Sequence, residues 1–178
     1  PDGGRTLAFP NKGAIMIETT NIFTTEAQSI PVKAILVGGL TAGVMDLSFA
    51  FTFWALKGAA PVAVLRGIAT GLLGPAARTG DAPVFLGLAS HFLLSLLFAA
   101  AFVLAASRVA PLGRLSPWLA GPLYGVAVYF LMNRVVLPLS NFAVPAGGMP
   151  ISLPDMAAHM FLFGLPIALA AHRWAKGI

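Results

Sequence analysis

The stretch from Ala34 to Leu56, AILVGGLTAGVMDLSFAFTFWAL, carries one charged residue, Asp46, in an otherwise apolar or weakly polar run. The hydrocarbon core of a bilayer is about 30 Å thick, and a helix needs about 20 mostly apolar residues to cross it. The stretch is long enough, so it predicts a transmembrane helix. It also places a carboxylate at a depth where no water is expected.

The composition of the whole chain indicates a membrane protein. Its 178 residues are 58% hydrophobic and 10% charged, whereas soluble domains are about half apolar and about a quarter charged. The net charge is +5, but the eleven Lys and Arg are scattered singly between apolar runs and form no basic stripe of the kind that binds nucleic acid. We therefore expect no nucleic-acid partner. The absence of cysteine excludes disulfides, thiol redox relays and iron–sulfur ligation.

Three more stretches are long and apolar enough to cross a bilayer. The segment over residues 61–77, PVAVLRGIATGLLGPAA, is interrupted by Arg66 and is too short to span, so we expect an interfacial or re-entrant helix there. The sequence thus predicts an all-α polytopic membrane protein, a four-helix transmembrane bundle. The expected organisation is a polar tail over residues 1–33, the bundle over 34–174 and a short basic end over 175–178, with the further spans at Ala82–Ala106, Trp118–Leu139 and Pro154–Trp174.

Lysine and arginine positions predict the orientation. If the N-terminus lies inside, the inner side receives five of these residues close to the spans and the outer side three. This fits the excess of positive charge found on cytoplasmic loops. We therefore expect a multi-pass protein of the bacterial inner membrane with both termini inside. The inner residues are Lys33, Arg108, Arg114, Arg173 and Lys176, and the outer ones are Lys57, Arg66 and Arg78.

The N-terminal tail begins PDGGRTLAFPNKGAI, which is polar and rich in Gly and Pro, and Met16 is a candidate natural start. Fixing a residue in place costs roughly 1–2 kcal/mol of backbone entropy. The tail has too few large apolar groups to offset that cost alone. An ordered tail would therefore need a neighbouring subunit along which to lie.

Each predicted span carries a polar residue in its outer half. At 1.5 Å per residue, Asp46 lies about 12 Å from the outer end, His91 about 13 Å, and Asn133 and His159 about 8 Å. Small residues lie three or four positions from these polar residues, on the same helix faces, and would let neighbouring helices approach there. The predicted intramembrane polar cluster is Asp46, His91, Asn133, Arg134 and His159, and the predicted packing positions are Gly39, Gly43, Gly87, Gly121 and Gly125.

Two interpretations of Asp46 remain open. It either makes a structural hydrogen bond or ion pair that fixes helix packing, or it is a functional group, as intramembrane ionisable residues are by default. An unpaired carboxylate at this depth costs at least about 2.5 kcal/mol, so we expect it to be paired or protonated. Arg134 is the expected counter-charge and Arg66 the second choice, whereas Asp155 is interpreted as a helix-start residue.

Five segments carry a resemblance when taken together and in order. They are AGVMDLSFAF, LRGIATGLLGPAA, GLASHF, LAGPLYGVAVYFLMNRVVLPLS and AAHMFLFGLPIALAAHR. The set resembles an uncharacterised family of bacterial four-span inner-membrane proteins with no assigned activity. The resemblance runs from Lys33 to Arg173 and leaves the tail unmatched. It implies a four-span fold and no particular function.

Three functions stay open. The first is a non-catalytic accessory or stabilising subunit of a larger membrane complex, respiratory or photosynthetic, whose thirteen Phe contact lipid, pigment or partner. The second is a small proton-coupled carrier in which Asp46 alternates between protonated and substrate-bound states. The third is a b-haem protein ligated by His91 and His159, although both are equally interpreted as neutral structural imidazoles. The sequence shows no catalytic constellation and no metal site, and it predicts no cofactor beyond bound lipid or pigment.

Overall fold

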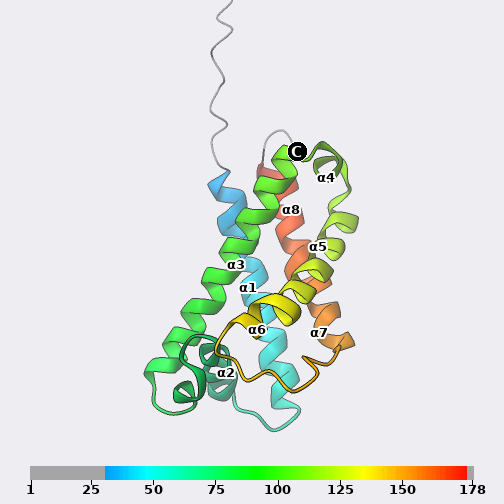
Figure 1. Ribbon diagram of the computed structural model, residues 1–178. Coiled ribbons are helices and arrows are strands. Elements are labelled where there is room, and N and C mark those ends of the chain that lie inside the picture. The colour runs from blue at the N-terminus through cyan, green and yellow to red at the C-terminus, as the bar shows by residue number, and fades with distance from the viewer. Residues whose placement is uncertain (1–30, 176–178) are drawn as a thin grey trace, which may run out of the picture.

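The computed structural model describes residues 31–175, and over that range the chain is helical and contains no strand (Figure 1). The all-α prediction is confirmed. The expectations for the N-terminal tail, for Met16 and for the last three residues lie outside the described residues. The elements are α1 (Val32–Ala55), α2 (Pro61–Leu73), η1 (Gly74–Arg78), α3 (Ala82–Arg108), α4 (Ala110–Arg114), α5 (Pro117–Leu131), η2 (Met132–Val136), α6 (Leu137–Leu139), α7 (Leu153–Ala158), η3 (His159–Gly164) and α8 (Leu165–Trp174).

Four helical stretches among the described residues are long and apolar enough to cross a membrane. Two are single helices, α1 and α3. The other two are composite, because α5 continues through η2 into α6 over Pro117–Leu139, and α7 continues through η3 into α8 over Leu153–Trp174. The prediction of a multi-pass protein with four spans is therefore confirmed.

The four spans run in alternating directions (Figure 1). The start of α1, the end of α8 and the short helix α4 lie at one end of the bundle, whereas α2 and the loop over residues 140–152 lie at the other. α2 has 13 residues and packs against α3. α1 packs against both α3 and α8, and α5 packs against η3 and α8.

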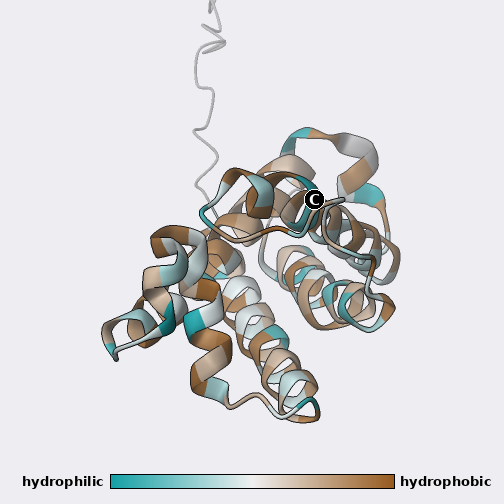
Figure 2. Ribbon diagram, turned by 60° about the horizontal axis from the view of Figure 1, so that its bottom comes forward, coloured by the Kyte–Doolittle hydropathy of each residue, from teal (hydrophilic) through white to brown (hydrophobic). Residues whose placement is uncertain are grey.

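Large apolar side chains cover the outside of the bundle. Figure 2 shows apolar residues around the helices rather than along one inward stripe. Phe85, Trp118 and Leu123 are 72%, 67% and 56% exposed. A helix that is apolar all round belongs in a large core or in a membrane, so this surface is expected to contact lipid.

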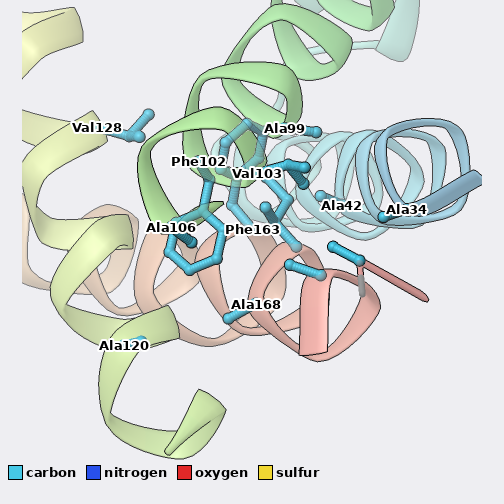
Figure 3. Close-up of a cluster of buried hydrophobic side chains, with 13 residues drawn as sticks. Ala34, Ala42, Ala99, Phe102, Val103, Ala106, Ala120, Val128, Phe163 and Ala168 are labelled. Carbon is cyan, nitrogen blue, oxygen red and sulfur yellow. The ribbon is translucent and has the colours of Figure 1, made fainter. Parts of the chain in front are cut away.

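The buried core consists mostly of alanine, with a few larger side chains between α3, α5 and the fourth span (Figure 3). The rings of Phe102 and Tyr124 are 4.9 Å apart, and those of Phe98 and Phe163 are 6.0 Å apart. Small side chains let helix backbones approach closely, which is how membrane helices gain contact energy.

Glycine permits the closest helix contacts. A Cβ added at Gly125 would collide with the backbone of His159, and one at Gly121 would collide with the backbone of Leu165. Gly164 faces both of these glycines from the opposite side. The third and fourth spans therefore meet backbone to backbone at this point.

Both composite spans contain a π turn directly before a proline. The residue that precedes each proline, Leu137 or Leu165, donates its N–H to the carbonyl five residues earlier. The prolines themselves, Pro138 and Pro166, have no N–H, and a proline ring clashes with the carbonyl four residues earlier in a regular α-helix. The wider turn accommodates each proline without ending the span.

We expect Gly125→Ala to destabilise the bundle, because the added methyl group meets backbone atoms that can move only by separating α5 from η3. Overpacking of this kind costs about 1–3 kcal/mol and would appear as a lower thermal unfolding midpoint in detergent. The control is Gly67→Ala in α2, where nothing lies within 4 Å of the new methyl. The free energy of unfolding of that variant should rise by about 0.4–1 kcal/mol. Equal effects of the two changes would contradict the backbone contact.

Candidate functional site

His91 on α3 binds the backbone of α1. Its Nε2 lies 2.9 Å from the Gly43 carbonyl oxygen. Because a carbonyl only accepts, Nε2 carries the proton and donates it, which leaves Nδ1 without one in a neutral ring. His91 is therefore a hydrogen-bond donor between two spans, and its half-buried ring lies edge-on to Phe92.

Ser95 repeats this bond one turn further along α3. Its Oγ donates to the Gly39 carbonyl over 2.6 Å, and the residue is only 1% exposed. Gly39 and Gly43 have the same four-residue spacing on α1 as His91 and Ser95 have on α3, so each carbonyl meets one donor. A Cβ on either glycine would press on α3. The missing side chains therefore bring the two carbonyls within reach.

Two tyrosines connect α5 to its neighbours. Tyr124 donates its hydroxyl proton to the Phe98 carbonyl of α3 over 2.7 Å. The Tyr129 hydroxyl accepts the Ser152 N–H over 2.8 Å, and Ser152 is the N-cap residue of α7. Tyr129 thus fixes the start of the fourth span against the third.

The acidic part of the site lies where α7 meets η3. His159 Nδ1 donates to the Asp155 carbonyl over 2.9 Å and lies 3.6 Å from the Asp155 carboxylate. The His159 ring packs edge-on against Tyr129, with 5.6 Å between the centroids. α1, which carries Asp46, packs against η3, which begins at His159. Asp155 and His159 therefore form a carboxylate–imidazole pair in a part of the fourth span that lies against α1.

Asp46 has no lysine or arginine within 4.0 Å in residues 31–175. The expected ion pair with Arg134 is not formed, because Arg134 is exposed and its Nη1 lies beside Gly148 in the loop that follows α6. Arg66, the second expected partner, lies 3.7 Å from Asp81 instead. Both arginines therefore contact loop residues at one end of the bundle and not the Asp46 carboxylate.

Asn133 bonds within its own helix. Its Nδ2 donates to the Tyr129 carbonyl over 2.9 Å. Neither a side-chain hydrogen bond nor an ion pair joins Asn133 or Arg134 to Asp46. The five residues of the predicted cluster are therefore not one bonded network.

Asp155 is the member of the site that the sequence interpretation missed. It does begin a helix, as expected, and its N–H is capped by the Ser152 hydroxyl. It is also four residues before His159, and residues with this spacing lie on the same helix face. That spacing was the available indication that the two side chains would meet.

Haem ligation would require the site to rearrange. His91 already uses Nε2 to bind the Gly43 carbonyl, so ligation through that nitrogen would break the bond between α1 and α3. His159 holds its ring through Nδ1 and keeps Nε2 as a free acceptor. Across residues 31–175, no three His, Asp or Glu side chains converge as metal ligands would.

Comparisons with protein-family models, curated proteins and solved structures find no match to this chain.

We expect Ser95→Ala to weaken the contact between α1 and α3. Interhelical hydrogen bonds in membranes contribute about 0.6 kcal/mol on average and up to about 1.7 kcal/mol. The control is Ser90→Ala, because the Ser90 hydroxyl bonds only to the Leu86 carbonyl of its own helix. Unfolding in mixed detergents should show a larger loss of unfolding free energy for Ser95→Ala. Equal losses would mean that the bond to Gly39 contributes nothing specific.

Proposed function

We propose that this chain is a non-catalytic accessory subunit that stabilises a larger bacterial membrane complex. The main support for this proposal is the position of Arg134, which is exposed and lies within the candidate span Pro117–Leu139. No carboxylate lies within 4.0 Å of it in the described part of the chain. A carboxylate of a partner subunit beside the Arg134 guanidinium, which lies next to Gly148, would supply the missing counter-charge.

The position of Arg134 makes an unpaired charge costly. Arg134 is five residues before Leu139, so its Cα lies about 8 Å inside the end of the span. Arginine at the centre of a membrane helix costs about 2.5–3.5 kcal/mol on insertion scales. The cost is smaller near the end, because the long side chain reaches the interface. An ion pair between subunits would offset the part of this free-energy cost that remains.

The internal hydrogen bonds also support a structural role. His91, Ser95 and Tyr124 all donate to backbone carbonyls of neighbouring spans. Two hollows in the described residues, one of about 10 Å³ beside α4 and one groove between α1 and α8, are lined by none of these side chains. A carrier is expected to place such groups around a substrate cavity instead.

We assign the end of the bundle that carries both Val32 and Trp174 to the cytoplasmic side of a bacterial inner membrane. This assignment rests on the excess of positive charge near that end. The apolar outer surface then contacts lipid and the other subunits. Outside the interior of the spans, the cations on that side are Lys33, Arg108, Arg114, Arg173 and, by its place in the sequence, Lys176, against Lys57, Arg66 and Arg78 on the other; Arg134, which lies inside the third span, is not counted.

We expect Arg134→Gln to weaken association with the partner. Native electrophoresis after mild detergent extraction should place the wild-type chain in a band far larger than 18.4 kDa, and the variant should shift towards the free chain. Removing one member of a buried charge pair costs at least about 2 kcal/mol, which is about a thirty-fold loss of affinity.

The matched control is Arg78→Gln, which removes an exposed arginine in η1, outside the spans. This variant should leave the large band unchanged. A wild-type chain that migrates alone after mild extraction would contradict the accessory function. A large band that Arg134→Gln leaves intact would reject Arg134 as the contact.

A small proton-coupled carrier is the second candidate, and the packing of α1, which carries Asp46, against η3 beside the Asp155–His159 pair favours it. Negative charges inside a membrane attract a cation, and intramembrane carboxylates often mark ion or substrate pathways. His159 lies beside Asp155 and could exchange a proton with it.

For the carrier, we expect proteoliposomes with an imposed proton gradient to take up a lipophilic cation such as ethidium. Asp46→Asn should abolish that uptake, because it removes the negative charge that would bind the cation. Asp81→Asn is the control, since the Asp81 side chain is 94% exposed and precedes α3. Absence of wild-type uptake, or full uptake by Asp46→Asn, would count against the carrier.

A further inference from the structure

An open groove of about 510 Å³ runs between α1 and the fourth span. Val37, Thr41 and Met45 line one side of it, at the regular four-residue spacing of a helix face. Residues of η3 and α8, from Phe161 to Trp174, line the other side. The lining is almost entirely apolar until the end of the groove at Arg173.

The groove has the length of a fatty acyl chain. Twelve residues separate Phe161 from Arg173, which corresponds to about 18 Å along a helix. The groove therefore reaches from the end of the bundle towards the middle of the membrane. An extended hydrocarbon chain would cover Pro166 and the side chains around it over that distance.

Two cations lie beside Trp174, which lines the end of the groove together with Arg173. Lys33 Nζ is 5.4 Å from the centroid of the Trp174 ring, and Arg173 Cζ is 5.8 Å from it. Neither cation has a carboxylate within 4.0 Å in the part of the chain that the structure describes. Tryptophan concentrates at the level of the lipid headgroups. Both cations therefore lie beside a ring that lines the groove at the expected level of the lipid headgroups.

We propose that this groove is a binding site for an anionic phospholipid, with one acyl chain between α1 and α8 and the headgroup phosphate on Lys33 and Arg173. Apolar lining alone would accept any lipid or a helix of another protein. The two cations beside Trp174 add the preference for negative charge. Arg108 and Arg114 lie at the same end of the bundle but neither line the groove nor lie over the Trp174 ring, so they provide a matched comparison.

The test uses Trp174 as a reporter. Trp54→Phe and Trp118→Phe remove the two other tryptophans, which are exposed. The full chain is then reconstituted in vesicles that contain phosphatidylcholine and phosphatidylglycerol, with bromine on the acyl chains of one or the other. Quenching of Trp174 fluorescence gives the relative affinity of the groove for the two lipids. We expect the anionic lipid to be preferred.

Lys33→Gln and Arg173→Gln should each lower that preference about five-fold, because a basic residue near an anionic membrane surface contributes about 1 kcal/mol. Arg108→Gln and Arg114→Gln should leave it unchanged. Thr41→Phe should reduce quenching by both lipids, because Thr41 lines the groove. Thr52→Phe, a change on an exposed part of the same helix outside the groove, should not.

Three results would overturn the proposal. The first is equal affinity for the two lipids. The second is an equal loss of preference in the Arg108 and Arg114 variants, which would indicate attraction to the membrane surface as a whole. The third is that Thr41→Phe leaves the quenching unchanged, or that neither lipid quenches Trp174, since either result would mean that no acyl chain lies in the groove. The Thr41 comparison decides the matter even if the cation variants fail to insert.

Discussion

Close backbone contact between helices is the constraint on which the rest of this structure depends. Lipid chains are as apolar as leucine, so membrane helices gain little by burying apolar side chains against each other, and packing and interhelical hydrogen bonds hold them together. Gly121, Gly125 and Gly164 let the third and fourth spans touch through their backbones. Gly39 and Gly43 bring two carbonyls of α1 to donors on α3. Because glycine has no side chain, these positions allow both the close helix packing and the interhelical hydrogen bonds.

The positions of the polar side chains around His159 depend on these backbone contacts. The His159 backbone lies against Gly125, its ring lies against Tyr129, and its Nδ1 is bonded to Asp155. The π turn that starts at His159 widens the span before the proline and keeps it continuous. Within residues 31–175, Asp46 and the exposed arginine in the third span remain without an opposite charge. That imbalance is the physical reason to look for a partner or a cation.

The four spans were predictable from sequence because a membrane forces every backbone polar group into a helix or closed barrel, so apolar length alone marks the crossings. The expected ion pair between Asp46 and Arg134 was wrong, because depth along a helix does not fix rotation about its axis or the tilt of its neighbour. The π turns could not be predicted either, since a hydrophobic pattern of period 3.6 does not show a single widened turn. Asp155 could have been assigned to the site from its spacing to His159, which shares its helix face.

Accessibility of a single cysteine at Ser95 tests the central claim most directly, namely that the polar groups inside the spans bond helix to helix and exclude water. The natural chain has no cysteine, so Ser95→Cys and Arg78→Cys each give one reactive site. The account predicts that a membrane-impermeant maleimide labels the exposed Arg78→Cys when it is added on the side where η1 lies, and that it leaves the buried Ser95→Cys unmodified from either side. Labelling of Ser95→Cys at a comparable rate would contradict it, because that result requires a water-filled path between α1 and α3.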